Sequence, residues 1–228
     1  MHTMKFNADL SQRACENIHK LEWEESSTVG VQRLRLERDD EQPPVERVTT
    51  VVRFAPGSSF AQNDHEGGEE FLVLDGTLSD QYGNYPAGTY GRNPKGTGHA
   101  PFSDDGCIML VKLWQMHPGD LQQLAINTRD EALWQKRADG SDALPLFEGD
   151  YESVCMLRWP AGLSMEEQQI DGGVEYYVLA GSFHDQDGVY QQGSWLRLPP
   201  GSRQTIHVDK QCTVYRKSGH LLNPVPYV

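Results

Sequence analysis

Three side chains in the first half of the chain, His65, Glu69 and His99, have the types and the spacing of metal ligands. A Gly67-Gly68 pair between His65 and Glu69 permits a tight turn, and His99 follows Glu69 by 30 positions. Two imidazoles and one carboxylate on adjacent strands suit Fe(II), Mn, Zn or Ni and leave coordination positions open. The pattern therefore predicts a divalent metal site, and the alternative is a polar barrel mouth that has lost its metal.

An internal repeat indicates the kind of fold that positions these residues. Residues 57–107 repeat at 162–212 at a constant offset of 105, with 18 of 51 positions identical and no gap. Chance at ordinary composition would give about three identities. Eight of the 18 shared residues are glycines or proline, which fix turns, so the two halves are predicted to share one fold. The ligand positions differ, because the second half has Ile170, Val174 and Gln204 there.

The elements that carry the repeat are predicted to be short strands. Apolar and polar residues alternate in brief runs, with turn residues every 8 to 12 positions, as in Val48–Phe54 before Ala55-Pro56-Gly57. This spacing is typical of an all-β sandwich or barrel. Residues 7–21 are the one place where a short helix is expected. A pattern break at 117–121 divides the chain into a metal-bearing domain, 1–122, and a second domain, 123–228, without metal ligands.

Composition excludes several classes of function. The chain has 33 acidic and 20 basic residues, a net charge of -13, which disfavours nucleic-acid binding and suits a protein that attracts cations. No apolar run approaches the roughly 18 residues of a membrane helix, and the N-terminus lacks a signal-peptide layout. A cytoplasmic protein with reduced cysteines is expected. Cys107 and Cys212, which are repeat equivalents, are predicted to be buried in strands.

The first half resembles the cupin superfamily. Its motif G-x5-H-x-H-x3,4-E-x6-G and its motif G-x5-P-x-G-x2-H are matched in spacing by Gly57, Asn63, His65, Glu69 and Gly76, then by Gly88, Pro94, Gly96 and His99. More narrowly, residues 25–116 resemble ChrR-type cupins, which occur in bacterial anti-sigma factors and in stand-alone relatives. The resemblance implies a bicupin of two jelly-roll (double-stranded β-helix) barrels. It also implies a bound divalent metal, zinc first, with iron, manganese or nickel as alternatives.

Two departures from the family pattern limit what the resemblance implies. Asn63 stands where the family has a histidine, so its amide is either a weak metal ligand or a hydrogen-bonding partner of a ligand. The zinc module with which ChrR proteins grip a sigma factor has no counterpart among the first 40 residues, where Cys15 and His19 form no cluster of Cys and His. A sigma factor is therefore not expected as a direct partner.

Three classes of function remain open at this stage. The leading hypothesis is a cytoplasmic sensory or regulatory cupin whose metal site binds a small-molecule ligand or an oxidant. The alternative is a metal-dependent enzyme, such as a dioxygenase of the quercetinase or diketone-cleaving kind. The third is a metal-free binder or structural bicupin, since fold alone does not choose among them. In each case the second barrel is expected to act as a scaffold or to supply a surface for a homo-oligomer.

Overall fold

A computed structural model describes residues 5–40 and 46–225 of the chain. Regular structure in these ranges is almost entirely antiparallel strand, as the sequence predicts, and the helices are two 3-10 turns, η1 (Ile18–Lys20) and η2 (Glu131–Leu133). The helix expected within residues 7–21 is limited to η1, because Ala14–Asn17 form strand β2, which pairs with another strand instead. None of the described helices is long and apolar enough to cross a bilayer.

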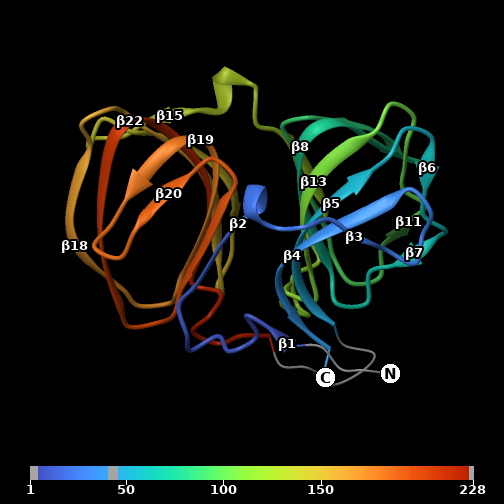
Figure 1. Cartoon of the computed structure of the whole chain (residues 1–228), viewed down its shortest axis with the longest axis horizontal. Helices are drawn as coiled ribbons and strands as arrows, with labels where there is room; N and C mark the ends of the chain where they lie inside the picture. Colours follow the sequence, from blue (N-terminus) through green and yellow to red (C-terminus); the bar gives the residue numbers. More distant parts are fainter. Residues whose placement is uncertain (1–4, 41–45, 226–228) are drawn as a thin grey trace. The chain divides into compact units, whose positions relative to one another are not determined.

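The described chain separates into two compact units, and Figure 1 shows the strands of each curving into a barrel. The first unit holds residues 5–8, 21–129 and 225, and the second holds 9–20 and 130–224. The sequence predicts a division at 122/123. Contacts instead group residues 9–20 with the second unit, because β2 pairs with strand β21 (Ser194–Leu198) there.

The main sheet of the first barrel runs in the order β1-β4-β5-β13-β8-β10-β14, and all of its pairs are antiparallel. Strands β7 and β11 form a small separate pair. The strands of this unit are β1 (Lys5–Phe6), β3 (Glu24–Glu25), β4 (Val31–Asp39), β5 (Arg47–Phe54), β6 (Ser58–Ser59), β7 (Asn63–Asp64), β8 (Glu69–Asp80), β9 (Gly83–Pro86), β10 (Thr89–Asn93), β11 (Gly98–His99), β12 (Phe102–Ser103), β13 (Cys107–Leu113) and β14 (Leu124–Asn127).

The second barrel repeats this plan with the order β15-β16-β17-β22-β19-β21-β2. A single long strand, β22, covers the stretch that the first barrel divides among β11, β12 and β13. The remaining strands of this unit are β15 (Gln135–Lys136), β16 (Asp142–Glu148), β17 (Ser153–Trp159), β18 (Ser164–Ile170), β19 (Val174–His184) and β20 (Val189–Gln191), with β22 at Ser202–Ser218.

Each barrel encloses its own apolar core, and repeat-equivalent residues occupy both. Phe54 and Cys107 pack in the first core, and their counterparts Trp159 and Cys212 pack in the second. The buried cysteines therefore take the places that the sequence predicts for them. Burial of this apolar surface is the main contribution to the stability of each unit.

One glycine shared by the two halves shows why the repeat keeps its glycines. Gly76 and Gly181 have φ of +70° and +73°, a region that residues with a Cβ rarely adopt. A Cβ at either position would also overlap the carbonyl oxygen of Gly106 or Gln211 on the neighbouring strand. The close approach of the two strand backbones thus requires glycine at this position in both barrels, whether or not the barrel carries metal-ligand residues.

Candidate metal site

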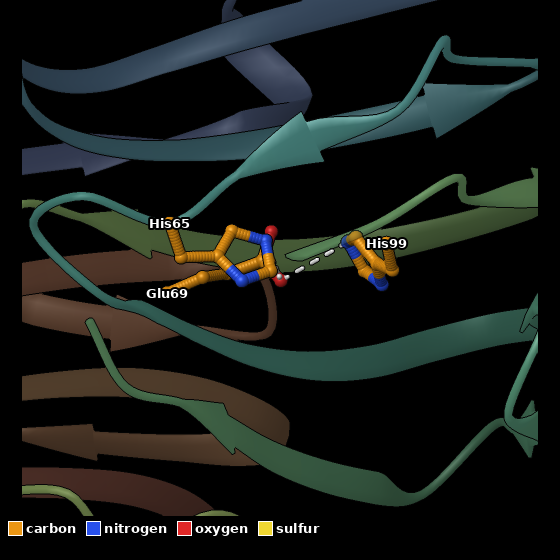
Figure 2. Close-up of side chains that lie close together, drawn as sticks. All are labelled: His65, Glu69 and His99. Atoms are coloured by element: carbon orange, nitrogen blue, oxygen red, sulfur yellow. Dashed lines mark ion pairs between the residues drawn. The ribbon is translucent and has the colours of Figure 1, made fainter. Parts of the chain in front are cut away.

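His65, Glu69 and His99 lie together inside the first barrel, and Figure 2 shows their side chains converging. His65 follows β7, Glu69 begins β8 and His99 ends β11. The backbone N–H of His65 donates to the Thr97 carbonyl oxygen at 2.9 Å, which fixes the β7 segment beside β11. All three side chains are buried, with relative exposures of 6%, 7% and 4%. The turn at Gly67-Gly68 brings Glu69 back beside His65, as the sequence predicts.

The distances within this group suit a bound divalent cation. Glu69 Oε2 lies 3.4 Å from His65 Nε2 and 3.5 Å from His99 Nε2. Two ligand atoms at bond lengths of roughly 2.1 Å from a tetrahedral metal are about 3.4 Å apart. One potential ligand atom from each residue falls within 4.8 Å of the others. Among the described residues, this is the one group of three or more His, Cys, Asp or Glu side chains with such geometry.

Hydrogen bonds on the far side of each imidazole direct its lone pair into the site. His99 Nδ1 is 2.9 Å from Asp80 Oδ2, and because a carboxylate only accepts, Nδ1 carries the hydrogen. His65 Nδ1 is 3.0 Å from Thr97 Oγ1, whose own hydrogen is donated to the Pro94 carbonyl oxygen at 2.7 Å. In the neutral form of each ring the lone pair is therefore on Nε2, which faces the carboxylate, and this is the form that ligates a metal.

The buried polar atoms of the site favour a bound cation. His65 Nε2 is buried and has no hydrogen-bond partner among the described residues, an arrangement that costs free energy unless a cation or donor fills it. Burial lowers the pKa of His65 below its ordinary value, and the neighbouring His99 adds to this against the opposing effect of Glu69. This shift favours the neutral ring, which is the form that a metal ligand must have. The donor set and the orphaned nitrogen fit a divalent metal.

Several residues that support the site were not predicted from the sequence. Asp80, Thr97 and Asn93 were missed, the last of which donates from Nδ2 to Glu69 Oε2 at 3.0 Å. Asp80 did leave a signal, because it is identical to Asp185 in the repeat. Thr97 is matched by Ser202, whose hydroxyl donates to Pro199 in the same way, so the repeat alone marks a turn there.

Asn63, the fourth position of the family motif, lies at the edge of the group. It is exposed on β7 and stands opposite His99 in the β7–β11 register. Directly opposed residues share a face of the pair, so the Asn63 side chain is on the same side as His99. Its assignment as a metal ligand remains a prediction.

A cavity of about 270 Å³ opens beside the group and is bounded partly by His65, Glu69 and Asn63. Its remaining walls are largely apolar and come from β5, β13 and the segments around them, notably Val52, Phe54, Phe60, Met109, Val111 and Trp114. One basic side chain, Arg33, also lines it. An apolar cavity with a few convergent polar groups is the usual form of a small-molecule site.

Glu70, adjacent to the ligand Glu69, belongs to the opposite face of β8. Its carboxylate accepts from Arg92 Nη1 at 3.3 Å and from the Tyr90 hydroxyl at 3.1 Å, and all three residues are buried. Glu175 and Arg197 repeat this pair of residue types in the second half. Glu70 thus belongs to the buried polar framework of the barrel.

The equivalent place in the second barrel keeps the geometry and lacks the ligands. Gln168 is opposite Gln204 in the β18–β22 register, as Asn63 is opposite His99. Gln204 Nε2 donates to Asp185 Oδ2 at 3.1 Å, which reproduces the bond between His99 and Asp80. Ile170 and Val174 supply no donor atoms, and the adjoining cavity is smaller, about 130 Å³.

Comparison with known protein families agrees with this two-barrel arrangement. The ChrR cupin-like domain matches residues 11–117 and again residues 122–222. The chain belongs to the ChrR cupin-like family. Both halves are therefore cupin barrels of one kind, and the chain is a bicupin, as the motifs and the repeat predict. Among proteins with curated descriptions, none matches the chain in sequence.

Solved structures show the same fold at low identity. A candidate dioxygenase from Nostoc punctiforme superposes with a TM-score of 0.76 at 13% identity, over 93% of this chain and 84% of that one. A nickel(II) complex of a bacterial pirin from Escherichia coli gives 0.66 at 13%, over 94% and 100%. A variant of oxalate decarboxylase from Bacillus subtilis gives 0.61 at 12%, over 90% and 77%. These likenesses extend to the fold of the whole bicupin.

Proposed function

We propose that the first barrel binds one divalent metal through His65, Glu69 and His99, and that a small molecule in the adjoining cavity meets the metal at its open positions. The observation that carries this proposal is the pair of imidazoles whose Nδ1 atoms are held by Asp80 and Thr97, so that both Nε2 atoms face one carboxylate oxygen. Such outer hydrogen bonds are the usual means of orienting metal-bound histidines.

The geometry favours a metal-dependent enzyme that acts on a small organic molecule. Three protein ligands leave positions free, and the cavity beside them is of a size for a small substrate. When bound, a metal of this 2-His-1-carboxylate class supplies Lewis acidity or, for iron, oxygen chemistry. The structural neighbours described as a candidate dioxygenase and as oxalate decarboxylase are in keeping with such a use of the fold.

A sensory function is the second candidate, and membership of the ChrR cupin-like family favours it. In that case the same metal and cavity bind a ligand or an oxidant without turnover, and a conformational change alters a partner. The cavity serves both functions, so the distinction lies in whether bound molecules are converted.

Metal analysis of the purified protein tests the shared part of the proposal. Wild-type protein is expected to hold one equivalent of metal, and His65→Ala and His99→Ala are expected to lose it while keeping the circular dichroism of the folded protein. His207→Ala, a histidine of the second barrel, is the control and should keep its metal. If both site variants retain wild-type metal content, the assignment is wrong.

Oxygen uptake separates the two candidates. Protein reconstituted with Fe(II) under argon is mixed with air-saturated phenols, β-diketones or carboxylates, and oxygen consumption and products are followed. Sustained uptake that disappears in His99→Ala supports the enzyme. Binding of the same compounds without any product would favour the sensor.

A further inference from the structure

Arg33 is a basic side chain inside the metal-bearing barrel. It lies on β4 opposite Val52 of β5, and Val52 belongs to the apolar core. Val31, two residues earlier on the same strand, belongs to that core as well. Since alternate residues of a strand share a face, Arg33 points inward, and it lines the cavity beside His65 and Glu69.

No ion pair engages this guanidinium in the part of the chain that the structure describes, and the Glu46 carboxylate acts on it only at a longer distance. Its Nε is buried without a hydrogen-bond partner, and its nearest aromatic contact is the Phe60 ring, 5.9 Å from Cζ. Burial lowers the pKa of Arg33 and the neighbouring Arg38 adds to the effect, while the Glu46 carboxylate opposes it. Arg33 is half-buried, and a partly desolvated cation without an ion pair is stabilised when an anion pairs with it.

The neighbouring arginines on the same strand already form ion pairs with acidic residues. Arg35 pairs with Glu24 at 2.7 Å, and Arg38 pairs with Glu46 at 3.2 Å. Glu46 also borders the cavity, but its carboxylate is thus engaged with Arg38. Arg33 is left as the cation that faces the cavity.

The second barrel has no cation at the corresponding position. Val52 is equivalent to Leu157 in the repeat, and the strand partner of Leu157 is Ala143. The cavity of the second barrel is lined by Arg137 and Arg216, which come from other positions. An arginine at this strand position is therefore particular to the half that keeps the metal-ligand residues.

The geometry points to a carboxylate-bearing substrate or ligand of the first barrel, an organic monoanion whose carboxylate pairs with Arg33 and whose apolar body lies against Phe54, Phe60 and Val52. The planar guanidinium matches a carboxylate with two parallel hydrogen bonds. The exposed carboxylates of Asp64 and Glu66 at the cavity rim disfavour more highly charged anions. This inference rests on the proposed function, because the far end of the molecule would reach His65 and Glu69.

Calorimetric titration of the purified full-length protein at fixed ionic strength tests the inference. The probes are benzoate and hexanoate, which combine a carboxylate with an apolar body, and benzamide, the neutral counterpart of benzoate. Wild-type protein should bind at least one carboxylate, and bind benzoate more tightly than benzamide. Arg33→Met should weaken carboxylate binding at least tenfold, as expected when a charge-assisted pair is lost. Benzamide affinity should stay the same.

Matched variants separate this inference from the metal assignment. Arg35→Met removes an arginine of the same strand that already has a partner, and it should bind benzoate within about twofold of wild type. Wild-type protein from which a chelator has removed the metal should keep most of the benzoate affinity. If wild-type protein contains no metal yet Arg33→Met loses benzoate binding, the proposed function fails and this inference stands.

Three outcomes would overturn the inference. They are absence of carboxylate binding to wild type at millimolar concentration, equal affinity of benzoate for wild type and Arg33→Met, and loss of benzoate binding when a chelator removes the metal. The last would mean that the carboxylate binds the metal directly. Arg33→Lys adds a check on folding, since it keeps the charge and should recover part of the affinity that Arg33→Met loses.

Discussion

His99 can ligate a cation only through Nε2, because its Nδ1 hydrogen is held by Asp80 at 2.9 Å. The choice of tautomer is therefore made by a residue that is not itself in the ligand group. The other carboxylate oxygen, Asp80 Oδ1, accepts the backbone N–H groups of Tyr82 and Gly83 at 2.8 and 3.1 Å, which fixes the direction of the carboxylate. At the scale of single residues, the site depends as much on these supporting bonds as on the three ligands.

We therefore expect Asp80→Asn to weaken metal binding by about tenfold to a hundredfold. An amide that keeps the turn hydrogen bonds at its oxygen presents its NH2 group to His99, so Nδ1 must accept and the hydrogen moves to Nε2. Competition with a chromophoric chelator gives the affinity. Asp185→Asn is the matched control in the second barrel, and it should leave metal affinity unchanged. Equal affinities for wild type and Asp80→Asn would remove Asp80 from the site.

Asn63 leads to a prediction of tighter, not weaker, metal binding. If its amide faces the metal as a weak ligand, Asn63→His restores the ligand set of the family and should tighten binding by about tenfold. The register opposite His99 puts the new imidazole on the correct face. The same chelator competition measures the gain. Unchanged or weaker binding would count against Asn63 as a ligand.

The sequence predicts the candidate metal ligands, but it does not predict the residues around them that complete the site. His65, Glu69 and His99 follow from motif spacing, because their side-chain types are rare together and the turns between them are fixed by glycine. Arg33 and Asn93 could not be found in this way, since neither is part of a motif and each acquires its environment only when distant strands pair. Asp80 was visible only as a carboxylate retained in both halves.

At the scale of elements, the tight approach of β8 to β13 is set by Gly76. Its φ is +70°, and a Cβ there would overlap the Gly106 carbonyl oxygen. Because the obstacle is backbone, the strands would have to move apart. The residues that follow Gly76 on β8 include Asp80, so this glycine in the strand also positions the partner of His99.

Gly76→Ala should accordingly lower the free energy of unfolding by about 1–3 kcal/mol. Gly83→Ala is the control, since a Cβ at Gly83 meets nothing within 4 Å, and it should change stability by less than about 0.5 kcal/mol. Urea denaturation followed by fluorescence measures both. Equal stability of the two variants would show that the strands separate at little cost.

Strand content was predictable and strand assignment at the N-terminus was not. Short apolar runs that end at turn residues identify β5 and β8, and consecutive residues of each are buried on both faces of the strand. Residues 14–17 carry no such signal, and their strand conformation comes from hydrogen bonding to β21. A local pattern does not report a partner that lies about 180 residues away.

At the scale of the whole molecule, the two barrels share a framework and differ in what it holds. Buried pairs of the same residue types recur in both, since Arg92 with Glu70 in the first half is repeated as Arg197 and Glu175 in the second. Duplication can preserve this framework while the ligand positions diverge, because the backbone turns and the chemistry reside in different residues. The chain is therefore expected to bind one metal, in the first barrel.

Anomalous scattering measured at the X-ray absorption edge of the bound metal shows how many metal sites each chain has. A peak near His65 and none near Gln204 is expected, because Ile170 and Val174 have no donor atoms and a single amide oxygen is a poor ligand. If the frameworks are equivalent, the combined substitution Ile170→His, Val174→Glu and Gln204→His should install a second site, since Asp185 already stands where it can orient residue 204 as Asp80 orients His99. Two equivalents of metal in that variant, against one in wild type, would support the shared geometry. A comparable peak near Gln204 in the unmodified protein would contradict the division of roles between the barrels.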